Sequence, residues 1–182
     1  MKLNFKALFV VLVFAVVSFS FKAGDLPEAK NEINWMTWTE VQEAQKKEPK
    51  KVFVDVYTSW CVWCKRMDAT TFHNEEIVDY INYNYYAVKF DAEQRETLVF
   101  KGRKYHYTKT GKRGYNELAT SLLGGVMSFP TTVYLDENLD VLTKVGGFLE
   151  ANELDPIISY FATDSYLKKK WSQYEKSYKS IL

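Results

Sequence analysis

Residues 52–64 read VFVDVYTSWCVWC, an apolar run that ends in two cysteines separated by two residues. Apolar and β-branched side chains over the first positions predict a central strand that is buried on both faces. The Lys-Arg-Met sequence that follows Cys64 indicates a short helix with this cysteine in its first turns. The pair is therefore expected where a strand meets a helix N-terminus.

Cys61 and Cys64 are the only cysteines of the 182-residue chain. Two thiols at this spacing can close into a small disulfide ring or open to a dithiol. At a helix N-terminus the first thiol meets unpaired backbone N–H groups, which favour its anion by roughly one pKa unit. Because disulfide stabilisation grows with loop length, a structural role is disfavoured. The pair predicts a redox couple that needs no further cofactor.

Zinc sites also use cysteine pairs, but a tetrahedral site takes three or four protein ligands. Only His73 and His106 add soft nitrogen donors, and their separations from the pair do not suit a metal. We therefore expect no metal, and metal binding stays open as an alternative to redox chemistry.

The composition limits the classes of partner. The chain is 47% hydrophobic and 26% charged, with a formal net charge of +1. A chain of this length builds one core of ordinary size, so we expect one domain and a monomer. The balanced charge provides no overall field that would recruit nucleic acid or an anionic membrane surface.

The N-terminal residues 1–23 have the pattern of a secretory signal peptide, because two lysines precede an apolar run of 15 residues and small residues follow. The run is shorter than the roughly 20 residues that span a bilayer. An uncleaved membrane anchor stays open as an alternative, and only in that case would we expect contact with a membrane. Residues 24–34 are polar and predict a flexible lead. We expect an exported protein, periplasmic if the source is a Gram-negative bacterium.

The remaining chain predicts helices and strands in mixed order. A capping box at Thr39 would begin a helix that ends before Pro49. Runs of strand-forming residues predict three further strands, at 86–90, 131–135 and 141–145, of which the last two form a hairpin. Polar caps followed by apolar series predict two further helices, from 74 and after 152. The fold class is α/β, with a central mixed sheet flanked by helices over residues 35–162.

Two segments lie outside this pattern. Residues 100–115 hold six basic residues and no acidic one. This composition is compatible with a nucleic-acid-binding segment, with a docking site for a protein, or with a solvated loop or hairpin. Export and the balanced total charge favour the solvated loop or hairpin. Residues 163–182 carry Leu167, Trp171, Tyr174 and Tyr178 at helical spacing. They predict an amphipathic C-terminal helix, packed on the domain or used to bind a partner.

The chain resembles the thioredoxin superfamily, especially exported thioredoxin-like domains such as the C-terminal domain of the bacterial thiol:disulfide interchange transporter. Four features carry the resemblance, in the family's order and spacing: Asp55 with the motif at 60–65, the strand 88–91, the segment 128–131 and the segment 143–146. The resemblance covers about residues 35–161 and implies a three-layer thioredoxin-like fold.

Cys61 is expected to be the nucleophile, partly exposed, and Cys64 the shielded resolving thiol one turn inside the helix. Asp55 is the one charged residue among apolar neighbours, and burial would raise its pKa. In the resembling family an acid at this position helps to deprotonate the second cysteine. The resemblance therefore implies Asp55 as general base toward Cys64, with Lys89 as its ionic neighbour. The alternative is an Asp55 that faces water at a strand end.

The resemblance also implies a substrate groove beside the first cysteine. Pro130 would follow a cis peptide bond, and the main chain of Phe129 would hold an extended substrate. Gly146 and Gly147 would let a nearby loop approach the groove closely. The remaining residues expected to contact substrate are Trp60, Val62, Trp63 and Gly146.

These features predict an exported thiol-disulfide oxidoreductase that reduces or exchanges disulfides of envelope proteins. Its partners would be disulfide-containing proteins and an upstream thiol electron donor. No histidine lies between the cysteines to stabilise the thiolate, so a reductase or interchange protein is favoured over an oxidase. The alternative is a non-catalytic binding module of the same fold that grips a partner with residues 100–115 and the C-terminal helix.

Overall fold

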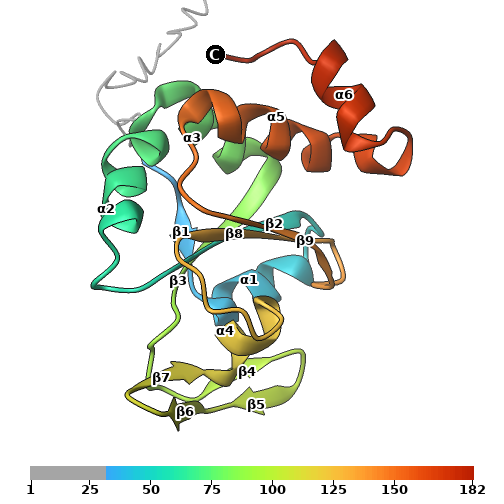
Figure 1. Cartoon of the computed structure of the whole chain (residues 1–182). Helices are drawn as coiled ribbons and strands as arrows, with labels where there is room; N and C mark the ends of the chain where they lie inside the picture. The colour runs from blue at the N-terminus through green and yellow to red at the C-terminus, as the bar shows by residue number, and fades with distance from the viewer. Residues whose placement is uncertain (1–31) are drawn as a thin grey trace, which may run out of the picture.

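Five strands form the central sheet in the order β1-β3-β2-β8-β9 (Figure 1). They span, in chain order, Trp35–Met36 (β1), Lys51–Tyr57 (β2), Tyr85–Asp91 (β3), Thr131–Leu135 (β8) and Val141–Gly146 (β9). β1, β3 and β2 run parallel, whereas β8 and β9 are antiparallel to their neighbours. The computed structural model describes residues 32–182, and over them the predicted α/β class with a mixed sheet is confirmed.

Helices cover both faces of the sheet (Figure 1). They span Trp38–Gln45 (α1), Val62–Ala69 (α2), Glu75–Asn84 (α3), Glu117–Leu122 (α4), Ala151–Ala162 (α5) and Trp171–Ser177 (α6). Two 3-10 turns lie at Thr71–His73 and Ser165–Leu167. α1 and α4 pack on one face, and α2, α3 and α5 on the other. The sheet is thus the middle of three layers.

Strand β2 is buried on both faces, as its apolar sequence predicts. Val52, Val54 and Val56 belong to the core under α1 and α4. Phe53 belongs to the core under α2, α3 and α5. Because side chains alternate along a strand, Asp55 points to the same face as Phe53, beneath the helix that carries the cysteines.

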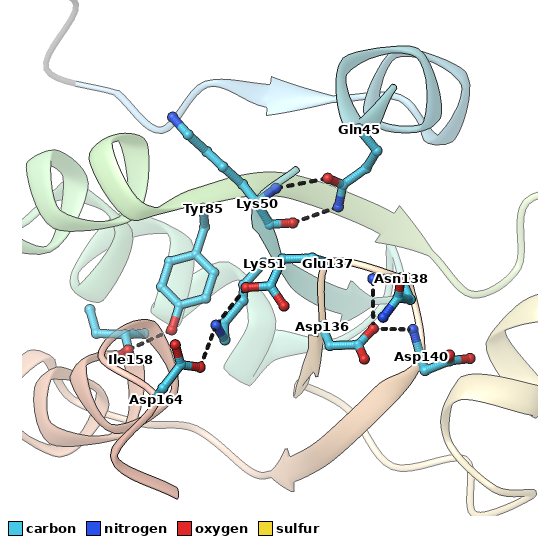
Figure 2. A network of polar contacts seen from close by, with 10 residues as sticks. All are labelled: Gln45, Lys50, Lys51, Tyr85, Asp136, Glu137, Asn138, Asp140, Ile158 and Asp164. Carbon is cyan, nitrogen blue, oxygen red and sulfur yellow. Dashed lines mark hydrogen bonds and ion pairs between the residues drawn. The ribbon is translucent and has the colours of Figure 1, made fainter. Parts of the chain in front are cut away.

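The polar network in Figure 2 holds the start of β2, at the end of the strand away from the cysteines. The buried Lys51 ammonium lies 2.7 Å from a carboxylate oxygen of Glu137 and 2.7 Å from one of Asp164. The side chain of Gln45 bonds the main-chain N–H and C=O of Lys50. These contacts tie the start of β2 to the β8–β9 turn, to the end of α5 and to the end of α1.

Helix α1 begins two residues earlier than the sequence suggests. Its N-cap is Thr37, whose hydroxyl accepts the N–H of Glu40 at 3.2 Å, and Glu40 in turn accepts the N–H of Thr37 at 2.7 Å. The predicted capping box at Thr39 is therefore wrong. Trp35 and Met36 form the short edge strand β1 on β3, so the chain turns into the helix directly after Met36.

We expect Thr37→Ala to lower the free energy of unfolding by about 1 kcal/mol, because the mutant loses the hydroxyl that caps the helix. Thr39→Ala is the matched control, since Thr39 is exposed and lies inside the first turn. Urea unfolding of both variants measures the difference. Equal losses in the two variants would contradict the assignment of Thr37 as the cap.

The N- and C-terminal segments differ from expectation. The predicted signal segment 1–23 and most of the predicted lead lie outside the described residues. Ile33 is buried, and the N–H of Asn34 donates to the side chain of Asn82 at 2.8 Å, so the end of that lead belongs to the fold. None of the helices within residues 32–182 is long and apolar enough to cross a membrane.

The C-terminal segment is not one helix, so that prediction is wrong. Asp164 has a left-handed backbone conformation that ends α5, and Leu167, in the following 3-10 turn, is exposed. α6 is seven residues long and packs Tyr174 against α5, where its hydroxyl donates to Ser159. The tail then bonds Asp155 through the hydroxyl of Tyr178. The predicted packing on the domain is confirmed for Tyr174.

The basic segment folds as part of two hairpins at the edge of the molecule beyond α4 (Figure 1). The strands are Leu98–Phe100 (β4), Arg103–Tyr105 (β5), Tyr107–Thr110 (β6) and Arg113–Asn116 (β7). The side chain of Gln42 on α1 bonds the main chain of Val99 and Lys101, which fastens the first hairpin to the domain. The hairpin interpretation of this segment is confirmed.

Candidate functional site

Cys61 and Cys64 form a disulfide at the start of α2, with their Cα atoms 5.3 Å apart. Cys61 is the N-cap residue of the helix, and its Sγ accepts the backbone N–H of Cys64 at 3.0 Å. The helix begins here because the chain leaves β2 through a turn in which the N–H of Cys61 donates to the carbonyl of Thr58. A Cys61 thiolate at this position would accept the same N–H at the positive end of the helix dipole.

Both cysteines are buried in this disulfide form. Cys61 is 5% exposed and Cys64 is 2% exposed, so the expected partial exposure of Cys61 is wrong here. The surface around the pair is made instead by its neighbours Trp60, Val62 and Trp63, which are all exposed. Their apolar side chains surround the approach to the sulfur atoms.

A surface depression of about 310 Å³ lies beside the helix N-terminus and is lined by Trp63, Phe129, Pro130, Gly147 and Phe148. Trp60 contacts Phe129 edge to face, with ring centroids 5.9 Å apart, and Trp63 contacts Phe148 at 5.5 Å. The Phe129–Pro130 peptide bond is cis, as expected. The segment before β8 therefore lies beside the cysteine loop and forms one wall of a groove.

Gly147, and not Gly146, lines this depression. Gly146 is the last residue of β9 and pairs with Thr131, whereas Gly147 has a φ of +104° and donates its N–H to the carbonyl of Pro130 at 2.8 Å. The left-handed conformation suits glycine and turns the chain from β9 toward Phe148. Of the two glycines expected beside the groove, Gly147 lines the depression and Gly146 does not.

Asp55 is 1% exposed, so the alternative of a water-facing carboxylate is wrong. Neither of its carboxylate oxygens has a hydrogen-bond partner within the described residues. The Lys89 ammonium on β3 lies 3.6 Å from Oδ2, which confirms the predicted ionic neighbour. Burial raises the pKa of Asp55 to about 7, and the Lys89 charge only partly opposes that effect.

Lys89 is shared with a second carboxylate that the sequence reasoning missed. Its ammonium forms an ion pair with Asp68 on α2 as well as with Asp55. Cys64 and Asp68 are four residues apart and lie on the same face of the helix. Since Asp68 and Asp55 meet at one ammonium, Cys64 lies on the face of α2 that covers Asp55. The i+4 spacing from Cys64 was the signal that could have found Asp68.

Two arginines also reach the rim and were not predicted. The Arg66 guanidinium lies 5.7 Å from the ring centroid of Trp63 and 5.6 Å from that of Phe148. The Arg113 guanidinium lies 4.0 Å from the ring centroid of Trp60. Arg113 comes from β7, about fifty residues from the cysteines, so no local pattern indicates its contact.

Within residues 32–182, no group of three or more His, Cys, Asp or Glu side chains could hold a metal ion. The two histidines that sequence reasoning considered are bonded elsewhere. The His73 ring contacts the carbonyl of Asp68, and the His106 ring contacts the hydroxyl of Thr97. The arrangement suits sulfur chemistry at Cys61 and Cys64.

Comparisons with known proteins agree with this geometry. Residues 26–180 match the family model Thioredox_DsbH, described as "Protein of unknown function, DUF255". Spermatogenesis-associated protein 20 of Mus musculus is 34% identical over 122 residues, which are 66% of this chain and 15% of that protein. The thiol:disulfide interchange protein DsbD of Actinobacillus pleuropneumoniae is 27% identical over 156 residues, 78% of this chain and 24% of that protein. The chain thus corresponds to a small part of each relative.

Solved structures share the fold at low sequence identity. A thioredoxin from Thermus thermophilus superposes with a TM-score of 0.55 at 13% identity, over 73% of this chain and 89% of that one. A structure described as DsbH oxidoreductase superposes with a TM-score of 0.51 at 19% identity, over 73% of this chain and 85% of that one. The fold is therefore thioredoxin-like, as the sequence resemblance implied.

Proposed function

Because the chain belongs to the Thioredox_DsbH family, we propose that it is a thiol-disulfide oxidoreductase that reduces or exchanges disulfides of other proteins. One observation carries the proposal: the Cys61–Cys64 disulfide lies at a helix N-terminus, between an apolar groove and a buried carboxylate. A purely structural disulfide would need neither neighbour. The thioredoxin-like fold supports the same chemistry.

In the proposed reaction the Cys61 thiolate attacks one sulfur of a partner disulfide. The partner S–S bond breaks, its other sulfur leaves as a thiolate that takes a proton, and a mixed disulfide with Cys61 forms. Cys64 then loses its proton and attacks Sγ of Cys61, which releases the second partner sulfur as a thiol. The partner gains two electrons, and the protein dithiol becomes the disulfide seen here.

Asp55 has the properties that proton removal from Cys64 requires. A pKa of about 7 means that the carboxyl holds and releases a proton near neutral pH. Its carboxylate oxygens are free of hydrogen bonds within the described residues, so they are available to a thiol or to a bridging water. The positive charge of Lys89 partly compensates the Asp55 carboxylate. The same ammonium also pairs with Asp68, which is more exposed than Asp55.

The groove supports a polypeptide substrate. Trp60, Val62 and Trp63 are exposed apolar side chains beside the disulfide, and Phe129 and Pro130 form the facing wall. Free main-chain groups near a cis-proline can pair with an extended segment. We propose Cys61, Cys64 and Asp55 as the reacting groups and these five residues as the substrate contacts, with Gly147 completing the groove.

Export and envelope substrates are part of the proposal. The lysine-flanked apolar run of residues 1–23 supports a secretory signal. A relative named as a thiol:disulfide interchange protein supports an upstream thiol donor and disulfide-containing protein partners. The direction proposed is reduction or exchange, because no basic residue lies between the two cysteines to stabilise the Cys61 thiolate.

Trapping the mixed disulfide tests the proposal. We expect the reduced Cys64→Ala variant to accumulate a covalent adduct with insulin, because the second attack is lost. Mass spectrometry should find one insulin chain on Cys61, removable by dithiothreitol. The control is Cys61→Ala/Cys64→Ala, which should form none.

Two results would contradict the proposal. Absence of the adduct in Cys64→Ala would remove Cys61 as the nucleophile. If natural partners stayed bound to the variant without cysteines as firmly as to the wild type, the non-catalytic binding module would be favoured instead.

A further inference from the structure

The hairpin of β6 and β7 packs one face against the two residues that flank the redox groove. Arg113 and Tyr115 alternate with Gly114 along β7, so their side chains share a face. Arg113 lies over the ring of Trp60, the residue before Cys61. Tyr115 lies 6.0 Å from the ring of Phe129, the residue before Pro130.

These contacts connect the hairpin to both sides of the mouth of the groove. Trp60 also contacts Phe129 directly, with ring centroids 5.9 Å apart. The cysteine loop, the proline segment and the inserted hairpin therefore meet at one place, although they are far apart in the sequence. A polypeptide that covers Trp60 and Phe129 on its way to the disulfide therefore also lies close to the hairpin.

The hairpin presents positive charge at this position. Between residues 101 and 113 there are six basic residues and no acidic one. Lys101 pairs with Asp140 and Arg113 with Glu93, the latter at 3.4 Å, and the Arg113 side chain is still 49% exposed. Lys112 is exposed and forms no ion pair within residues 32–182, whereas Lys109 pairs with Gly114 and therefore lies on the opposite face of the hairpin from Arg113. Lys112 lies in the turn next to Arg113.

We propose that the β6–β7 hairpin is a third wall of the groove, and that Arg113 and Lys112 select partner disulfides whose cysteine is flanked by acidic residues. The proposal rests on the proposed function. Uncompensated charge beside a reaction site raises the local concentration of oppositely charged partners and the rate of their encounter. Arg113 is the specificity-determining residue, since its guanidinium is held against Trp60 at the mouth of the groove.

The test compares two peptide disulfide dimers, one with glutamates and one with lysines on both sides of the cysteine. For each dimer we measure the rate constant with which it oxidises the dithiothreitol-reduced protein. This value is divided by the rate constant with which the same dimer reacts with 2-mercaptoethanol. This ratio removes the intrinsic difference between the peptides. We expect the glutamate dimer to be preferred at least about tenfold at low salt. The preference should fall in about 1 M salt, where charges are screened beyond about 3 Å.

The variant Lys112→Gln/Arg113→Gln should lose most of the preference, and Arg113→Lys should keep more of it than Arg113→Gln. The matched control is Lys47→Gln/Lys176→Gln. It removes the same charge from exposed positions outside the hairpins. That control should keep the wild-type preference.

A neutral disulfide, bis(2-hydroxyethyl) disulfide, separates the possible failures. Its rate should be unchanged in the hairpin variant. An equal loss with all three disulfides would mean that the hairpin only supports the fold, and equal rates of the two dimers with the wild type would also overturn the inference. A protein that reacts with none of the disulfides would refute the proposed function itself.

Discussion

Replacing Cys61 with serine should lower the rate of insulin disulfide reduction at least about a thousandfold. The serine hydroxyl does not ionise near neutral pH, and the helix dipole offers only about 0.3–2 kcal/mol toward its anion. Cys64 should not take over the first attack, because it lies inside α2, whereas Cys61 is the N-cap residue at the positive end of the helix dipole. The dithiothreitol-coupled reduction of insulin, followed by turbidity, measures the loss.

Val62→Ser is the matched control for this experiment. Val62 is 74% exposed and lies in the same loop, so its replacement introduces the same side chain without removing a sulfur atom. We expect its rate to stay within a few-fold of the wild type. A Cys61→Ser variant with a rate near that of Val62→Ser would show that Cys61 is not the attacking thiol.

The second large effect concerns stability, and it depends on pH through Asp55. Burial raises the pKa of this carboxyl from 3.8 to about 7 in the folded protein. Between these two values the unfolded chain has released the proton while the folded chain still holds it. The unfolded state therefore binds fewer protons, and the free energy of unfolding falls as the pH rises through this window. The penalty is absent below the lower value and complete above the upper one.

We expect Asp55→Asn to have a higher free energy of unfolding than the wild type at pH 8, by as much as about 4 kcal/mol. This value follows from the pKa shift of Asp55, since each pKa unit corresponds to about 1.36 kcal/mol. The gain should become small near pH 4, where the folded carboxyl is protonated and only about half of the unfolded carboxyls are ionised, and it should vanish below about pH 3. Asparagine has nearly the shape of the neutral acid but cannot accept the Cys64 proton. The same variant should therefore release the mixed disulfide more slowly.

Urea unfolding of the oxidised proteins between pH 4 and pH 8 measures the stability difference. Asp79→Asn serves as the control, because that carboxylate is exposed on α3, and its stability should follow the wild type. If the advantage of Asp55→Asn did not grow with pH, Asp55 would not be the destabilising buried acid described here.

The local sequence was sufficient to predict the strand and the helix that position the two cysteines. The apolar run before the cysteines predicts β2, and the residues after them predict α2, because a buried strand and a short helix each have their own local pattern. Asp55 stood out for the same reason, as a charge in an apolar strand. The strands at Thr131–Leu135 and Val141–Gly146 were predicted to within a residue.

The predicted helix boundaries were wrong where the local sequence allowed two interpretations. Thr37 and Thr39 both stand near Glu40, and only the pairing of β1 with β3 decides which of them caps the helix. Leu167 continues a helical apolar series, yet the left-handed turn at Asp164 redirects the chain. In both cases contacts with distant strands or helices outweigh a local preference of about 1 kcal/mol or less.

The sequence by itself determined the cysteine pair between a strand and a helix, the acid within an apolar strand and the α/β order of the chain, because these depend on neighbouring residues and their spacing. Only the tertiary structure decided that Lys89 is shared between Asp55 and Asp68, and that Gly147 lines the groove. It alone brought Arg113 onto Trp60. Such contacts join residues from different strands, helices and hairpins, and their distances are set by how these elements pack together, which no local periodicity records.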